Sequence, residues 1–205
     1  MKYLYSEDSR VNGSAKLVVG VFFAAFAGWF LYATYHAIMM PGAYISDIIL
    51  SLLALTFLVK RAAGSYRYVL TETAVVLEER SIFGNRTFEI PLDDIDGICE
   101  STKDIFRRIK FRRTYKLHSS LDDRRTWMLV YSVVEGGKMI HIRAAIKVTE
   151  QFLHELDNMV PGRVNITLNE VSFFALIREE AYRTGYRDVA QYRADLKAGV
   201  LDEDD

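Results

Sequence analysis

Cysteine and catalytic motifs are what this sequence has least of. It contains a single cysteine, Cys99, which excludes an intramolecular disulfide and a zinc site built from several cysteines. Because Cys99 lies in a largely apolar segment, we expect it to be a small buried side chain rather than a reactive thiol.

Short motifs of the common enzyme classes are also missing. The sequence has no nucleophile elbow, no phosphate-binding glycine loop and no zinc-binding helix motif. His118, His141 and His154 are scattered and lack the spacing of metal ligands. We therefore expect a non-enzyme with no catalytic residue, metal or cofactor, although a site assembled from distant residues would escape this reasoning.

No charge of either sign dominates the chain. It has 26 basic against 27 acidic residues, so bulk charge gives it no attraction to nucleic acid. We therefore expect no nucleic-acid partner, and only local charge patterns remain informative.

The most prominent feature present is an apolar run from Leu17 to Val59, broken once near residues 40–42. The first segment, Leu17 to Met40, has no charged residue, and about 20 apolar residues suffice to cross ~30 Å of hydrocarbon. The second, Ala43 to Val59, is shorter and carries Asp47 in its first turn. A signal peptide followed by a buried helix is disfavoured, because the apolar stretch is too long. Residues 17–61 therefore predict a two-span transmembrane hairpin.

The orientation of this hairpin follows from its flanking charges, because loops rich in Lys and Arg stay in the cytosol. The turn between the spans contains neither residue, whereas both flanks are basic, with Lys2, Arg10 and Lys16 before and Lys60, Arg61 and Arg67 after. We therefore predict a multi-pass membrane protein with both termini cytosolic and residues 1–16 as a cytosolic lead. Aromatic residues at the opposite end, Tyr32, Tyr35 and Tyr44, are typical of a membrane interface.

Small residues recur in the first span at Gly20, Ala24 and Gly28, on one helical face. Such spacing lets helices approach closely. The facing surface would be Ser51 and Ala54 of the second span or another copy of the chain, unless the spacing is coincidental.

After Arg61 the hydrophobic periodicity changes from helical to β. We expect seven consecutive antiparallel strands, followed by an amphipathic helix from Val148 to Met159. The strands are expected at 66–71, 74–80, 86–90, 95–101, 105–117, 126–135 and 138–143, with a tight hairpin turn at Gly136-Gly137. Such a chain forms a small α+β barrel or sandwich.

Residues 66–98 carry short motifs that point to a family. They are Tyr68-Val69-Leu70-Thr71, Phe83-Gly84, and Ile90-Pro91-Leu92 with Ile95. This passage resembles the opening of the bacterial pleckstrin-homology-like (PH-like) domain, and the layout with two preceding spans resembles the YcxB-like proteins. The resemblance implies a PH-like domain over residues 66–160 and a location in the bacterial cytoplasmic membrane, and it supplies no catalytic residues.

Residues 161–205 lie outside the resemblance and are predicted to be a helical extension. Asn169 would cap one helix that ends before Gly185, a second would run from Asp188 to Ala198, and the acidic tip at 202–205 would be mobile.

The one stretch that indicates a possible binding surface is Ile105 to Leu117. If it is extended, alternate side chains share a face, and one face then forms a basic ridge of Arg108, Lys110, Arg112 and Lys116. Each cation near an anionic bilayer contributes about 1 kcal/mol of attraction. The alternatives are a solvated face or an edge strand whose charges prevent aggregation.

Two functional hypotheses follow. The first is a membrane-anchored, non-catalytic interaction module whose cytosolic PH-like domain binds a protein partner or anionic lipid headgroups. The second is a structural subunit that self-associates through its transmembrane helices.

Overall fold

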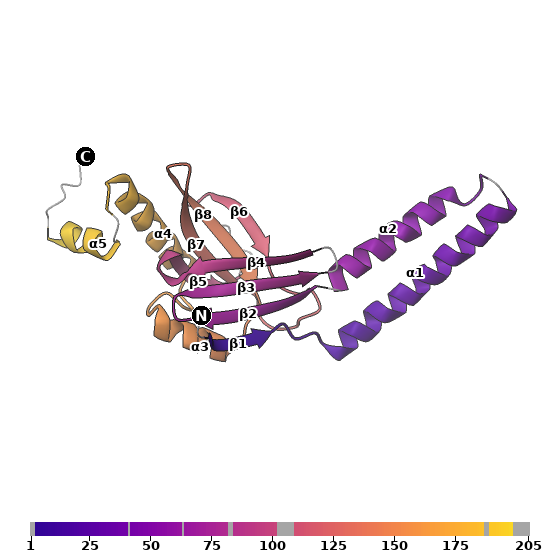
Figure 1. The fold of residues 1–205 in the computed structure, drawn as a ribbon, viewed down its shortest axis with the longest axis horizontal. Coiled ribbons are helices and arrows are strands. Elements are labelled where there is room, and N and C mark those ends of the chain that lie inside the picture. Colours follow the sequence, from indigo (N-terminus) through magenta and orange to yellow (C-terminus); the bar gives the residue numbers. More distant parts are fainter. Residues whose placement is uncertain are drawn as a thin grey trace.

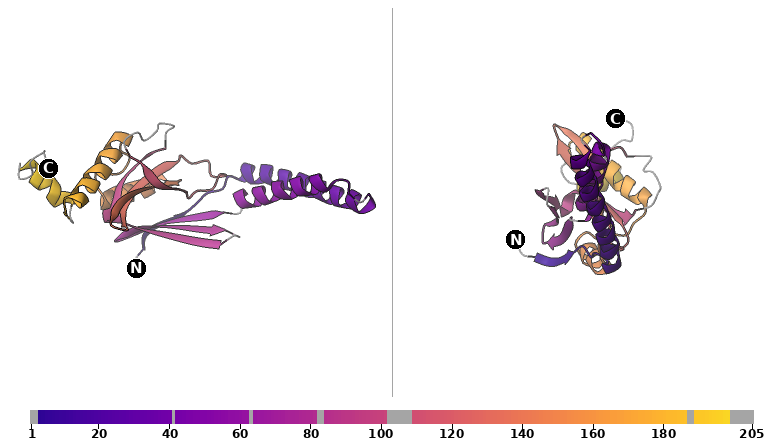
Figure 2. Two further views of the ribbon diagram at one scale, coloured as in Figure 1. Left: turned by 90° about the horizontal axis from the view of Figure 1, so that it is seen from above. Right: turned by 90° about the vertical axis from the view of Figure 1, so that its right-hand side faces the viewer.

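The computed structural model describes residues 3–40, 42–62, 64–81, 84–101, 109–186 and 189–198. A long helical hairpin projects from one end of a mixed α+β domain (Figure 1). The hairpin consists of α1 (Gly13–Met39) and α2 (Ile45–Ala62). Figure 2 shows from two other sides that the hairpin continues the long axis of the domain rather than folding back over it.

The first sheet joins strands from both sides of the hairpin. It holds four antiparallel strands in the order β1 (Tyr3–Asp8), β2 (Ser65–Thr71), β3 (Ala74–Ser81) and β4 (Gly84–Pro91). β1 precedes the hairpin and pairs with β2, which follows it, so that Asp8 lies opposite Arg67. The chain therefore leaves and re-enters the same sheet at the two ends of the hairpin.

The second sheet contains β5 (Ile95–Glu100), β6 (Phe111–Lys116), β7 (Trp127–Glu135) and β8 (Lys138–Ile146), in the order β5-β7-β8-β6. A short 3₁₀ turn, η1 (Leu92–Asp94), leads into β5 from the first sheet. β6 lies parallel to β8, whereas the other pairs are antiparallel.

The main core lies between the two sheets and is closed by α3 (Glu150–Met159). Tyr68, Leu129 and Phe152, from the first sheet, the second sheet and α3, belong to one buried cluster. On the outer face of the second sheet lies α4 (Leu168–Arg183), where Val171 packs against Cys99. α5 (Val189–Lys197) then packs on α4.

The α+β class, the C-terminal helix of the domain and the helical extension are confirmed. The strand count is wrong, because the described residues form eight strands rather than seven. The missing strand is β1, which lies inside the segment predicted to be a lead and finds its partner beyond the hairpin. No seven-stranded barrel is seen; the strands form two four-stranded sheets.

Two boundaries also differ. Residues 105–108 of the strand predicted from 105 to 117 lie outside the described residues, and within the described part, 109–117, the strand runs from Phe111 to Lys116. The cap of α4 is Thr167 rather than Asn169, because Thr167 and Glu170 exchange bonds in a capping box, which satisfies two exposed amide groups at once.

Gly97 is the point where β5 and the segment before α4 come closest. A Cβ at this position would lie 2.7 Å from Ile166 Cδ1 and 3.3 Å from the Arg163 carbonyl oxygen. We expect Gly97→Val to lower the free energy of unfolding by about 1–3 kcal/mol through overpacking. Denaturant titration of the full chain in mild detergent measures this. Gly13→Ala is the matched control because its Cβ would meet nothing within 4 Å, and equal effects of both changes would contradict the prediction.

Candidate functional site

The surface of α1 is apolar and exposed. It is 27 residues long, and the most apolar 18-residue stretch has a mean hydropathy of 1.9 with only 6% of it buried. A core helix of a soluble domain would be mostly buried, so this exposure indicates association with a membrane. Among the described residues, α1 is the one helix that is long and apolar enough to cross a bilayer.

α2 is less uniformly apolar than α1. Its 18 residues include three charged ones, Asp47 in the first turn and Lys60 and Arg61 in the last. Support for a second span therefore comes from the topology of the chain and not from the composition of α2.

The small-residue face of α1 is exposed at all three of its positions. Gly20, Ala24 and Gly28 are exposed, and a Cβ at either glycine would meet nothing within 4 Å. The tight contact between the helices instead buries Ala33 and Ser51 completely. Packing of the stripe against Ser51 and Ala54, or against another copy of the chain, stays a prediction.

Aromatic rings gather where α1 meets α2, at the end of the hairpin far from the domain. His36 lies 4.4 Å from Tyr32 and 5.3 Å from Tyr44, measured between ring centroids. Tyr35 also contacts His36. Amphipathic rings of this kind concentrate at the boundary between membrane and water.

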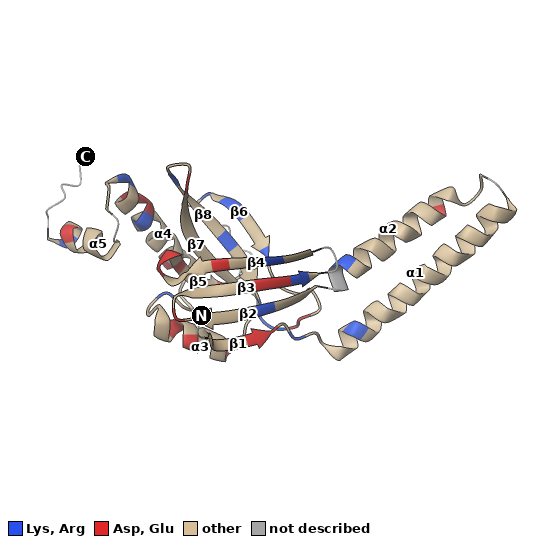
Figure 3. Cartoon of the chain, in the orientation of Figure 1, with Lys and Arg blue, Asp and Glu red and all other residues tan. Residues whose placement is uncertain are grey.

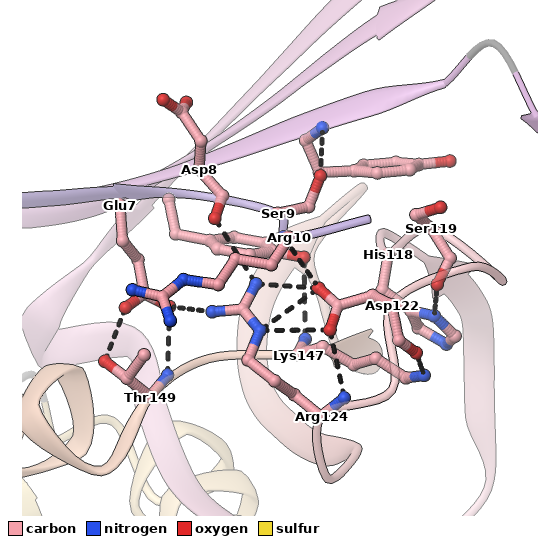
Figure 4. Close-up of polar contacts among 12 residues, drawn as sticks. Glu7, Asp8, Ser9, Arg10, His118, Ser119, Asp122, Arg124, Lys147 and Thr149 are labelled. Carbon is pink, nitrogen blue, oxygen red and sulfur yellow. Dashed lines mark hydrogen bonds and ion pairs between the residues drawn. The ribbon is translucent and has the colours of Figure 1, made fainter. Parts of the chain in front are cut away.

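A polar cluster joins the domain to the base of the hairpin (Figure 4). Arg124 donates from Nε to Asp122 Oδ1 at 3.0 Å and from Nη2 to Asp122 Oδ2 at 2.7 Å. Its Nη1 donates to Glu7 Oε1 at 3.0 Å. Glu7 also accepts the backbone amide of Thr149, the N-cap of α3. One guanidinium therefore connects β1 to the loop before β7 and, through Glu7, to α3. We name Glu7, Asp122, Arg124 and Thr149 the joint.

The same loop holds the first turn of α1. The Asn12 backbone amide donates to the Leu121 carbonyl at 3.1 Å, and its side chain donates to Asp123 Oδ2 at 3.1 Å. The Asn12 side-chain oxygen accepts from the Ser14 amide and so caps α1. The joint thereby fixes the direction in which α1 leaves the domain.

The charged side chains of the joint are largely buried. Asp122 has a fully buried carboxylate, and Arg124 and Glu7 keep only 14% and 9% of their side chains exposed. Burial alone would raise the pKa of Asp122, but hydrogen bonds from Arg124 and from the Arg10 amide outweigh it and hold the pKa below its usual value.

A second polar network lies between the second sheet and α4. Ser132 donates to Asp96 and contacts His141 Nδ1 at 2.7 Å, and His141 Nε2 lies 3.2 Å from Glu179. Arg178 Nε donates to Asp96 Oδ1 at 2.7 Å. We call these five residues the buried relay. Burial raises the pKa of the Asp96 carboxyl, and the Arg178 charge opposes that shift.

The buried relay resembles a catalytic triad in composition but not in accessibility. The Ser132 hydroxyl is committed to Asp96, and Ser132 is only 1% exposed. The Ser132 oxygen lies 2.7 Å from His141 Nδ1, and His141 Nε2 lies 3.2 Å from Glu179 Oε2. Each of these polar side chains has a hydrogen-bonding partner in the network, and the contacts of Arg178 and Glu179 hold α4 on the sheet.

The predicted basic ridge is only partly visible. Arg108 lies outside the described residues, whereas Lys110, Arg112 and Lys116 are exposed. The register of β6 on β8 shifts between Phe111 and Arg113, so strict alternation is interrupted there. β6 runs toward the hairpin end of the domain (Figure 1). Binding through this ridge stays a prediction.

Cys99 is buried, as expected, and burial raises the pKa of its thiol to about 11. Within the part of the chain that the structure describes, no three or more His, Cys, Asp or Glu residues gather in a way that could hold a metal ion.

No known protein family, curated protein or solved structure matches the chain. The likeness to the PH-like domain accordingly stays a prediction, and function is argued from the geometry alone.

Proposed function

We propose that this protein is a membrane-anchored, non-catalytic interaction module. Its helical hairpin crosses the bilayer twice, and its domain stays on the cytosolic face, where it binds a protein partner or anionic lipid headgroups. The observation that carries the proposal is the pairing of β1 with β2 across the hairpin.

That pairing constrains the number of crossings. Asp8 and Arg67 are opposite each other in one sheet, so both ends of the hairpin lie on the same side of any bilayer that α1 enters. At ~1.5 Å per residue, α1 is about 40 Å long, which exceeds a hydrocarbon core of ~30 Å. If α1 crosses, the chain must cross back, and α2 is the segment available for the return.

α2 is adequate for this return despite its charges. Its 18 residues span about 27 Å. Asp47 at one end and Lys60 at the other would sit at opposite interfaces, where a lysine stem can extend its charge toward water. A helix slightly shorter than the hydrocarbon core is accommodated by local thinning of the bilayer.

Charge supports a cytosolic domain. The basic residues of the hairpin base, Lys16 and Lys60, lie at the domain end of the two helices (Figure 3). The outer turn carries the aromatic residues and no Lys or Arg. Because basic residues remain on the cytosolic side, the domain is placed there in the proposal.

A second candidate, a self-associating structural subunit, is supported by one feature. The stripe of Gly20, Ala24 and Gly28 is exposed, so that another copy of the chain could pack on it.

The topology has a direct test. A reporter that is active only outside the cytosol is expected to work when inserted at Gly42 and to fail when fused after Asp205. The reason is that two crossings put the turn and the C-terminus on opposite sides. Activity is measured in intact cells, with a cytosol-active reporter at the same sites as the control. The reverse pattern, or equal activity at both sites, would refute the proposed function.

A further inference from the structure

An apolar groove opens at the base of the hairpin, between the domain-proximal turns of α1 and α2. Val19 and Phe23 line it from α1, Leu58 and Val59 from α2, and Leu121 closes it from the loop of the joint. Its volume is about 390 Å³. Since α1 exposes its apolar surface around the groove, the groove opens sideways into whatever surrounds the hairpin.

The groove has a cationic end. Lys16 is its one charged lining residue among those described, and it is exposed. Lys60, also exposed, follows Val59 directly in α2. An apolar wall thus leads to the charge of Lys16, and Lys60 follows the lining residue Val59 by one position on α2.

Gly20 keeps the groove open. It lines the groove, and a Cβ added there would meet no atom within 4 Å. A larger side chain would therefore project into free space rather than clash with the fold.

We infer that the groove binds an anionic phospholipid, with an acyl chain between α1 and α2 and the headgroup phosphate against Lys16 and Lys60. This inference rests on the proposed function, because a hairpin in the bilayer surrounds the groove with lipid. Apolar walls favour an acyl chain over water, and the cations complement a phosphate at the depth of the headgroups. The amphipathic form of the groove matches one lipid molecule in its natural orientation.

The test uses the full chain, purified in mild detergent and stripped of lipid. It is titrated separately with phosphatidylglycerol, which is anionic, and with phosphatidylcholine, which is zwitterionic, and bound lipid is counted by mass spectrometry. Wild type is expected to retain phosphatidylglycerol in preference. Gly20→Leu is expected to lose it, because the new side chain fills the groove. Gly28→Leu makes the same change two turns farther along α1, outside the groove, and is expected to bind as wild type does.

The headgroup contact is tested by Lys16→Gln. One cation near an anionic group is expected to account for about a five-fold preference for phosphatidylglycerol. Lys138→Gln, at the start of β8 next to the β7–β8 turn, is the control. Free inorganic phosphate as competitor is expected to displace little lipid, because it lacks the chain.

Three results would overturn the inference. They are no preference of wild type for the anionic lipid, unchanged binding by Gly20→Leu, and a change in oligomeric mass by Gly20→Leu with bound lipid unaltered. The last would identify the groove as a contact between copies of the chain. A chain that passes the reporter test but fails here contradicts only the lipid site, whereas failure of the reporter test contradicts the proposed function itself.

Discussion

Asp96→Ala is expected to lower the free energy of unfolding by about 3–5 kcal/mol. Asp96 is fully buried and accepts hydrogen bonds from Ser132 and Arg178. Its removal leaves the Arg178 guanidinium, which is 12% exposed, without its carboxylate. An uncompensated charge in such a setting costs that much because water cannot replace the lost partner.

Denaturant titration of the full chain in detergent measures this effect, with Asp93→Ala as the matched control. Asp93 is exposed in η1, the 3₁₀ turn that leads into β5. Its replacement is expected to change the free energy of unfolding by no more than about 0.5 kcal/mol. The double variant Asp96→Ala/Arg178→Met is expected to be more stable than Asp96→Ala alone, since it removes the stranded charge. A single variant no less stable than the control would show that Asp96 does not hold the buried relay together.

Part of the buried relay could be predicted from the sequence. The turn at Gly136-Gly137 pairs Glu135 with Lys138, and the same register places Ser132 opposite His141. Counting along the predicted hairpin would have brought these two polar side chains together. The contributions of Arg178 and Glu179 could not be predicted, because they depend on where α4 docks on the sheet.

The joint could not be predicted from the sequence, for a different reason. Glu7 and Arg124 are separated by most of the chain, and their contact requires β1 to pair with a strand on the far side of the hairpin. Local pattern identifies helices and strands well but carries no information on such pairing. The same holds for β6, whose parallel contact with β8 contradicts the simple succession of antiparallel neighbours.

Arg124→Ala is expected to cost about 3–5 kcal/mol and to loosen β1 from the domain. The change leaves the carboxylates of Asp122 and Glu7 buried near each other without their shared cation. Arg125→Ala, one residue later, is the matched control, because its ion pair with Glu100 joins two largely exposed side chains and contributes about 0–1 kcal/mol. Hydrogen exchange of the β1 amides should accelerate in the first variant and not in the second.

The joint also has an expected pH dependence with a definite sign. Arg124 outweighs burial and holds the pKa of Asp122 below its unfolded value of about 3.9. The folded state therefore binds this proton less readily, so the contribution is fully present above that value and is lost as pH falls through the folded pKa. Wild type should lose stability between about pH 5 and pH 2 more steeply than Asp122→Asn, as measured by thermal unfolding across that range. Parallel curves for the two proteins would mean that Asp122 is not held ionised by Arg124, and the joint would then stabilise the base of the hairpin through packing alone.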